Sequence, residues 1–284
     1  MTATFEPITG RYVRLSIDGR DHRVYVEEAG EGPPLLCLHT AGADSRQYRA
    51  ILNDPEITSH HRVVTFDMPW HGKSSPPAGW HAEGDYTLST DTYIATVLAV
   101  MEALDLDKPI VVGCSIGGRI VLHLARKYPE MMRAVVGLQS GPHVDPYYDL
   151  DWLHRPDVHG GLVCAGIVSG LIGPDAPDEH RWETLWHYMQ GGPGIFKGDL
   201  HFYKGEGDIR QHLAEIDTSR CPVYLLSGEY DYSATPDDTR SVAAAVRGSS
   251  IEIMDGLGHF PMSEDPDAFL AYFRPVLESI RNGS

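Results

Sequence analysis

The sequence predicts an α/β fold built around a mostly parallel, doubly wound sheet. Short apolar runs recur along the chain, and segments with helical periodicity lie between them. A run that is apolar throughout is typical of a strand covered by helices on both faces, and strands that alternate with helices are typical of parallel sheets. With 284 residues, of which 42% are hydrophobic, the chain can bury one large core and carry a modest insertion.

The N-terminal part predicts an antiparallel hairpin. Residues 12–17 and 23–28 alternate apolar and polar side chains, and Asp18-Gly19 between them is a turn sequence. The alternation indicates that one face of the hairpin is exposed to water. We therefore expect the hairpin at an edge of the sheet.

The parallel part of the sheet begins after the turn at residues 30–34. Each expected strand is an apolar run, and each expected helix is an amphipathic segment that follows one. The strands are expected at residues 35–38, 63–66, 110–114, 134–138, 222–226 and 250–254, and the helices at residues 88–104, 116–128, 237–246 and 266–280.

The alternation stops between residues 141 and 215, where aromatic residues, His, Gly and Pro become frequent. We interpret residues 142–215 as a helical cap inserted into a core of residues 1–141 and 216–284, with a helix at residues 178–189 and a break at residues 191–194. The candidate substrate contacts in this cap are Trp152, Trp186 and Tyr188. The alternative is an appendage that buries its own aromatic side chains.

The net charge and the absence of membrane or export signals limit the partners and the location that we expect. A formal net charge of −17 repels phosphate backbones and anionic lipids, so we expect a small-molecule substrate and neither nucleic acid nor membrane as partner. No apolar run is long enough to cross a bilayer, and residues 1–10 have no export signal. We expect a cytoplasmic protein, and the sequence does not indicate its oligomeric state.

The cysteines and histidines do not predict a metal site. The four cysteines are widely spaced without a C-x-x-C pair, and we expect buried free thiols rather than disulfides or metal ligands. Fifteen histidines are present, but no H-E-x-x-H motif occurs. We therefore expect neither a metal nor another cofactor. The cysteines in question are Cys37, Cys114, Cys164 and Cys221.

A G-x-S-x-G pattern surrounds Ser115, between the strand at residues 110–114 and the following helix. A sharp strand-to-helix turn strains the serine backbone and is sterically possible only when Gly113 and Gly117 have no side chains. Such a turn lifts the hydroxyl above the sheet edge, which suits a nucleophile for acyl transfer. The alternative is a tight turn whose serine only caps the helix.

Two further strands end in residues that could activate this serine. Asp231 follows the strand at residues 222–226, and His259 follows the strand at residues 250–254 in a Gly-flanked loop. Because these strand ends meet at one edge of a parallel sheet, the order Ser115, Asp231, His259 predicts a catalytic triad. Glu229 and Asp255 are rival carboxylates. Taken singly, His259 could be a surface histidine and Asp231 a helix cap.

Hydrolysis by such a triad needs two backbone donors for the oxyanion. Ile116 N–H, at the start of the helix after the nucleophile, is one candidate. The loop His39-Thr40-Ala41-Gly42 after the strand at residues 35–38 should supply the other, with Ala41 preferred over Thr40.

Together these motifs resemble those of the α/β-hydrolase fold superfamily, and the resemblance covers nearly the whole chain. The turn Asp67-Met68-Pro69-Trp70-His71-Gly72-Lys73-Ser74 also matches. The resemblance implies an eight-stranded, mostly parallel sheet, a cap inserted after the sixth strand, and hydrolysis without a cofactor. Two positions differ, since family members usually have glycine where this chain has Thr40 and Trp70. We expect Trp70 to pack against its turn, and the alternative is that it narrows a pocket wall.

The expected function is therefore that of a serine hydrolase. The aromatic cap favours a carboxylic ester or lactone of a medium-sized apolar or aromatic substrate, cleaved through an acyl-enzyme. A rival is a carbon–carbon bond hydrolase acting on a diketone, for which Arg119 or His143 could bind a carboxylate. For Arg119 we expect instead exposure to solvent or pairing with an acid. A further alternative is a ligand receptor on the same fold.

Overall fold

The computed structural model describes residues 3–144, 150–205 and 207–283. Within this part of the chain eight strands form one sheet in the order β1-β2-β4-β3-β5-β6-β7-β8. β2 pairs antiparallel with both β1 and β4, and the remaining neighbours are parallel. The predicted fold class and the hairpin at the sheet edge are confirmed. The strands are β1 Thr9–Ile17, β2 Arg20–Ala29, β3 Pro34–Leu38, β4 Arg62–Phe66, β5 Ile110–Cys114, β6 Ala134–Leu138, β7 Val223–Gly228 and β8 Ser250–Met254.

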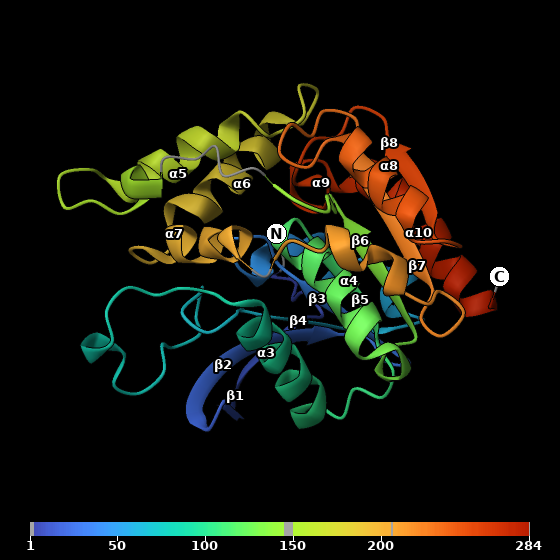
Figure 1. Ribbon diagram of the computed structural model, residues 1–284, viewed down its shortest axis with the longest axis horizontal. Helices are drawn as coiled ribbons and strands as arrows, with labels where there is room; N and C mark the ends of the chain where they lie inside the picture. The colour runs from blue at the N-terminus through green and yellow to red at the C-terminus, as the bar shows by residue number, and fades with distance from the viewer. Residues whose placement is uncertain (1–2, 145–149, 206, 284) are drawn as a thin grey trace.

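Helices cover both faces of the sheet (Figure 1). The buried residues of α3, α4 and α8 pack on one face, and those of α1, α2, α9 and α10 pack on the other. The helices are α1 Arg49–Leu52, α2 Pro55–Thr58, α3 Thr90–Ala103, α4 Ile116–Lys127, α5 Gly160–Ser169, α6 Asp178–Met189, α7 Ile195–Leu200, α8 Pro236–Ala245, α9 Pro261–Glu264 and α10 Pro266–Asn282.

The helix starts follow from local capping. The Ser89 side chain accepts a hydrogen bond from Thr92 N–H at the start of α3, and Thr235 and Asp238 form a reciprocal capping box at the start of α8. Both arrangements satisfy N–H groups that the first turn of a helix leaves without partners.

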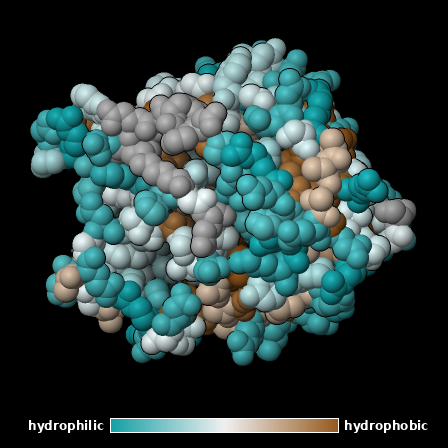
Figure 2. All heavy atoms as spheres, in the orientation of Figure 1, coloured by the Kyte–Doolittle hydropathy of each residue, from teal (hydrophilic) through white to brown (hydrophobic). Residues whose placement is uncertain are grey.

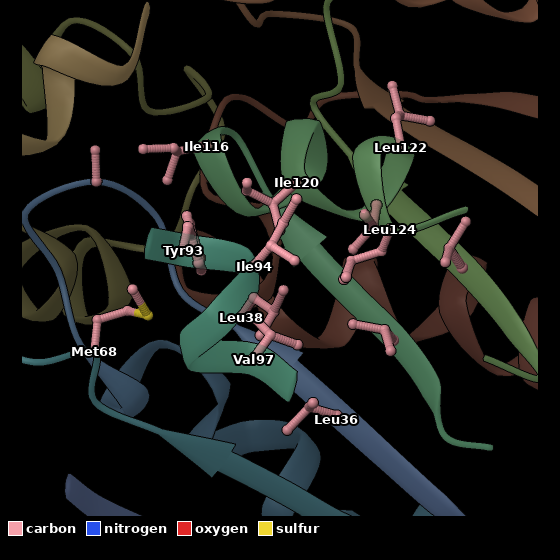
Figure 3. Packing of buried hydrophobic residues seen from close by; sticks show 14 of the residues in the cluster. Leu36, Leu38, Met68, Tyr93, Ile94, Val97, Ile116, Ile120, Leu122 and Leu124 are labelled. Carbon is pink, nitrogen blue, oxygen red and sulfur yellow. The ribbon is translucent and has the colours of Figure 1, made fainter. Parts of the chain in front are cut away.

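The core that supports β5 lies between the sheet and the helices α3 and α4. Figure 3 shows Ile94 and Val97 of α3 and Ile120 of α4 gathered around Leu38 of β3. All four side chains are buried, with at most 4% of their surface exposed. Burial of apolar surface stabilises a fold by about 25 cal/mol for each Å². Contacts of this kind therefore hold the end of β5 and the start of α4 in place.

The segment between β6 and β7 contains the helices α5, α6 and α7, which lie together beyond the sheet (Figure 1). The expected helix at residues 178–189 coincides with α6, and the expected break at residues 191–194 falls between α6 and α7. Backbone contacts place this segment on the side where the parallel strands end, since His259 N–H donates to Leu171 O at 2.8 Å. The boundaries 142–215 as a separate cap unit stay a prediction.

The surface is mostly hydrophilic, and the cysteines lie in the interior. Figure 2 shows a mostly hydrophilic face with hydrophobic residues visible mainly in the recesses. The four cysteines are buried and free, as predicted. In the described part of the chain, no helix combines the length and apolar character needed to span a bilayer.

Candidate active site

Ser115 lies in the strained turn between β5 and α4 that the sequence predicts. Its backbone has φ 60° and ψ −113°, a conformation rare for a residue with a side chain. A Cβ on Gly113 would lie 2.4 Å from the Gly117 carbonyl oxygen, and one on Gly117 would lie 2.8 Å from Leu38 O. The two glycines are therefore required by the close approach of backbone segments, as expected for this turn.

His259 and Asp231 are in direct contact. His259 Nδ1 lies 2.8 Å from Asp231 Oδ2, and both side chains are buried. Asp231 Oδ1 accepts hydrogen bonds from Ser233 N–H and Ala234 N–H, at 2.7 and 3.1 Å. Because the carboxylate accepts at both oxygens, the proton between the two side chains belongs on Nδ1, which leaves Nε2 as an acceptor.

The two rival carboxylates are not near this imidazole. Glu229 and Asp255 are exposed, and Glu229 Oε2 accepts a hydrogen bond from Gly256 N–H at 3.0 Å. The carboxylate that the structure brings to His259 is that of Asp231.

Ser115 and His259 line the same small cavity, whose volume is about 30 Å³. Within the described chain, the Ser115 hydroxyl has Tyr203 OH as its hydrogen-bond partner, at 3.4 Å, rather than His259. Catalytic hydrogen bonds are often loose before a substrate binds, so this geometry is that of a resting site. The other lining residues are Thr40, Ala41, Val144, Val168, Leu171, Tyr188, Phe196, Leu200, Ser233 and Phe260.

The loop after β3 contributes Ala41 to the lining of this cavity. Thr40 N–H donates to Gln47 Oε1 at 3.0 Å, and Gly42 N–H donates to Asp199 Oδ2 at 2.7 Å. Ala41 N–H, between them, has no hydrogen-bond partner among the described residues. Ile116 N–H is the first N–H of α4 and has no partner within the helix. Ala41, which lines the cavity, and Ile116, which does not, stay the predicted oxyanion donors, whereas the Thr40 N–H is already used.

The two departures from the family pattern have local explanations. The Thr40 hydroxyl contacts Gln47 Oε1 at 3.0 Å and forms a hydrogen bond with Tyr188 OH, so it links the loop to α6. Trp70 has φ 79° and packs against Trp80 and Tyr86, each with ring centroids 5.2 Å away. These contacts compensate for a backbone conformation that glycine would adopt more readily.

The candidate cap residues divide into one inside and two outside the cavity. Tyr188 is buried and lines it. Trp152 and Trp186 are 48% and 56% exposed and do not line it, so their assignment as substrate contacts stays a prediction. On α6 the helical period turns Trp186 away from the face that carries Tyr188, and the Trp152 ring stacks instead against the Arg155 guanidinium, 4.7 Å away.

Arg119 is buried and donates to a backbone carbonyl, which corrects the expectation of exposure or an acid partner. Its Nη1 donates to Gly207 O at 2.7 Å, and its guanidinium lies 5.4 Å from the Tyr203 ring centroid. Burial lowers the pKa of Arg119 to about 10. His143 Nδ1 lies 3.5 Å from Asp208 Oδ2. Neither of these two side chains lines the cavity, so neither is placed to bind a substrate carboxylate there.

Glu264 is a buried residue near the triad that sequence reasoning missed. Its carboxylate accepts hydrogen bonds from Gly258 N–H, from Phe260 N–H at 3.2 Å and from Gly173 N–H at 3.3 Å. Burial raises the pKa of Glu264 to about 7 even though three N–H groups donate to it. The side chain therefore holds the backbone on both sides of His259 and ties it to the segment after α5.

Tyr203, Asp199 and Glu264 lack a motif that would identify them from sequence. Each contacts a partner more than four residues away along the chain, so only the fold brings them to the site. In the described part of the structure, no group of three or more His, Cys, Asp or Glu side chains is placed to hold a metal ion.

Comparison with known proteins identifies the family of the chain. A family model described as alpha/beta hydrolase fold matches residues 33–158. A 2-hydroxy-6-oxo-6-phenylhexa-2,4-dienoate hydrolase of Burkholderia cepacia is 30% identical in an alignment of 300 positions that covers 100% of both chains. The chain belongs to the α/β-hydrolase fold superfamily. It is thus a member of a family of hydrolases.

Other members of the α/β-hydrolase superfamily resemble the chain more distantly. A pimeloyl-[acyl-carrier protein] methyl ester esterase of Nitrosospira multiformis is 24% identical over 87% of this chain and 95% of its own. A solved esterase from Thermogutta terrifontis superposes with a TM-score of 0.82 at 17% identity, over 95% of this chain and 99% of its own. An enol-lactonase from Burkholderia xenovorans LB400 superposes with a TM-score of 0.80 at 18% identity, over 94% and 100%. At these identities the structural similarity shows the fold alone.

Proposed function

We propose that the protein is a serine hydrolase that cleaves a carboxylic ester or lactone through an acyl-enzyme. The observation that carries the proposal is that Ser115, the His259–Asp231 pair and the unpaired Ala41 N–H meet at one cavity. A nucleophile, an oriented base and an oxyanion donor are the parts that acyl transfer needs.

The reaction begins when Ser115 Oγ attacks the substrate carbonyl carbon. His259 Nε2 takes the serine proton, while Asp231 keeps the imidazole in the tautomer with a proton on Nδ1. The carbonyl oxygen becomes an oxyanion that accepts hydrogen bonds from Ala41 N–H and Ile116 N–H. The imidazolium then protonates the leaving alcohol, and the serine ester remains. Water attacks this ester with His259 again as base, which releases the acid and restores the serine.

The resting cavity is too small for the proposed substrate. A water molecule needs about 10 to 15 Å³ of such space, so about 30 Å³ holds roughly two waters. Residues of the segment between β6 and β7, among them Tyr203 and Phe196, form one wall. This segment has to move for substrate to enter, and the Ser115 hydroxyl has to turn from Tyr203 to His259.

The lining favours an uncharged acyl group. Apolar side chains dominate it, and none of the described lining residues is Lys or Arg. A buried carboxylate without a cationic partner is costly, so an apolar ester or lactone suits the cavity better than a substrate with a carboxylate near the reacting carbonyl. The apolar and aromatic side chains are those of Ala41, Val144, Val168, Leu171, Tyr188, Phe196, Leu200, Tyr203 and Phe260.

Carbon–carbon bond hydrolysis is the second candidate, favoured by the full-length similarity to the Burkholderia cepacia hydrolase. The two reactions are separated by comparing kcat/KM for p-nitrophenyl butyrate with that for 2-hydroxy-6-oxo-6-phenylhexa-2,4-dienoate. We expect the ester to be the better substrate. A dienoate kcat/KM that exceeds the ester value a hundredfold would replace the first proposal with the second.

The serine itself is tested with Ser115→Ala, which should abolish hydrolysis of p-nitrophenyl butyrate while the protein stays folded. Ser241→Ala is the matched control, because Ser241 is an exposed serine on α8 that donates to Asp238 O. We expect the control to keep wild-type kcat. Substantial ester turnover by folded Ser115→Ala protein would remove the serine from the mechanism.

A further inference from the structure

Asp199 of α7 joins the cap segment to the loop that carries Ala41. The carboxylate is buried and accepts three hydrogen bonds, all from residues outside the segment between β6 and β7. Gly42 N–H and His71 Nε2 lie 2.7 and 2.8 Å from Oδ2, and Tyr86 OH lies 2.9 Å from Oδ1. A buried carboxylate is stable only when its oxygens are satisfied in this way.

His71 carries a positive charge in this arrangement. Its Nε2 faces the Asp199 carboxylate and its Nδ1 faces Pro69 O at 3.0 Å, so both ring nitrogens have acceptors and both carry protons. Burial opposes the charge, but Asp199 outweighs it and raises the pKa of His71. Burial likewise acts to raise the pKa of Asp199, and the charge and hydrogen bond of His71 lower it overall.

The neighbouring histidine is neutral. His39 Nε2 accepts a hydrogen bond from Met68 N–H at 3.1 Å, and its Nδ1 lies 2.8 Å from Thr40 O. One nitrogen therefore accepts and the other donates. The His39 and His71 rings lie 4.9 Å apart, so burial together with the His71 charge lowers the pKa of His39. Asp199 and His71 form a buried ion pair beside the loop.

The turn that carries Ala41 is hydrogen-bonded to this ion pair through Gly42 N–H. Ala43 N–H donates to Thr40 O at 3.3 Å, which closes a turn with Ala41 and Gly42 at its centre. Gly42 has φ 70°, and a Cβ there would lie 2.8 Å from the Phe196 Cβ of α7. The Asp199 bond to Gly42 N–H sets the orientation of the peptide that follows Ala41.

We infer that Asp199 is a positioning residue that assembles the oxyanion hole when α7 is docked on the core. The inference rests on the proposed function, because it assigns the Ala41 N–H to the oxyanion. When α7 moves away to admit substrate, Gly42 loses its acceptor and the turn loses its support. Closure therefore restores the donor geometry at the moment the substrate is enclosed.

The test replaces Asp199 by Asn, which keeps the size of the side chain but removes its charge. The Asn amide oxygen can accept from Gly42 N–H or from His71 Nε2–H, but it has no negative charge to stabilise a doubly protonated imidazole. We expect kcat for p-nitrophenyl butyrate to fall about 10- to 100-fold with KM changed less than threefold, since a slightly misplaced oxyanion donor weakens transition-state binding. The rate of Ser115 labelling by a fluorophosphonate should fall by a similar factor.

Glu183→Gln is the matched control. Glu183 of α6 forms an ion pair with Arg49 of α1, so it also joins the cap segment to the core, but it does not contact the Ala41 turn. We expect its kcat to stay within twofold of wild type. If Asp199→Asn does not fold, His71→Gln gives the same comparison, because it removes the charge that holds Asp199, and its kcat should fall with little change in KM.

The outcomes separate this inference from the proposed function. Wild-type protein that neither hydrolyses esters nor reacts with a fluorophosphonate overturns the proposed function, and the inference with it. Labelled wild-type protein together with an Asp199→Asn kcat within twofold of wild type overturns the inference alone. Equal losses in the Asp199 and Glu183 variants also overturn it, because they indicate loosening of the cap segment in general.

Discussion

The strained backbone of Ser115 presents its hydroxyl to the cavity. A side chain in this conformation costs on the order of 1 to 3 kcal/mol, which the packing of β5 and α4 on both sides has to offset. In this conformation the Ser115 side chain makes no capping hydrogen bond to α4, although Ser115 directly precedes the helix. The strained backbone of Ser115 therefore lowers the free energy of unfolding and keeps the residue at the cavity.

Tyr203 should contribute to catalysis through its hydroxyl, which is 3.4 Å from Ser115 Oγ in the resting site. Once the serine turns to His259, we expect this hydroxyl to face the reacting carbonyl. We expect Tyr203→Phe to lower kcat for p-nitrophenyl butyrate about fivefold, as for one neutral hydrogen bond of about 1 kcal/mol. Tyr232→Phe, at a tyrosine that is 68% exposed, is the control. An unchanged or higher kcat in the Tyr203 variant contradicts the assignment.

Asp231 should be the carboxylate that orients the base. Asp231→Asn keeps an acceptor for Ser233 N–H and Ala234 N–H but favours the wrong imidazole tautomer. We expect kcat to fall by about 10⁴ with a folded protein. Asp255→Asn, at the exposed rival carboxylate, should leave kcat within twofold, and steady-state assays of both variants decide between the two positions. A larger loss at Asp255 reverses the assignment.

At the scale of elements, the sequence predicts the core well because burial on both faces leaves a simple pattern. The strands β5, β6 and β8 coincide with the expected residues, and the triad residues follow strands in the expected order. Less could be predicted for the segment between β6 and β7, because the exposure of a helical side chain depends on neighbours that the sequence does not specify. Trp186 and Tyr188 are two residues apart on α6, yet one is exposed and the other lines the cavity.

The close packing of α4 on the sheet should make Gly118 irreplaceable. A Cβ at Gly118 would lie 2.3 Å from Leu138 O, so Gly118→Ala should destabilise the protein by several kcal/mol or prevent folding. Gly166 of α5 has open space around its Cβ position, and Gly166→Ala should be neutral or stabilise the protein by up to about 1 kcal/mol. Thermal or urea unfolding measures both. Comparable stability of the two variants contradicts the described packing.

At the scale of the whole molecule, buried neutral histidines should make the fold sensitive to acid. Burial, aided by nearby arginines, lowers the pKa of His123 and of His187 to about 4. Between pH 6.5 and pH 4 the unfolded chain binds a proton at each position and the folded protein does not. Stability is therefore lost as the pH falls through this window, by about 1.4 kcal/mol per pH unit for each histidine.

The acid sensitivity is measured by thermal unfolding of wild type and His123→Leu between pH 4 and pH 7. We expect the melting temperature of the variant to fall less steeply with acid than that of wild type. His71 acts in the opposite sense, because its raised pKa favours the folded state at low pH and the advantage disappears as the pH rises above 6.5. Parallel melting curves for wild type and His123→Leu would contradict a buried neutral His123.

We propose that the hydroxyl at position 115 is the nucleophile activated by His259. Peptide mass spectrometry after reaction with a fluorophosphonate tests this role directly. We expect one adduct, on Ser115, that is absent from Ser115→Ala and strongly reduced in folded His259→Ala. An adduct on another residue, or ester turnover by wild-type protein that leaves Ser115 unlabelled, would contradict it.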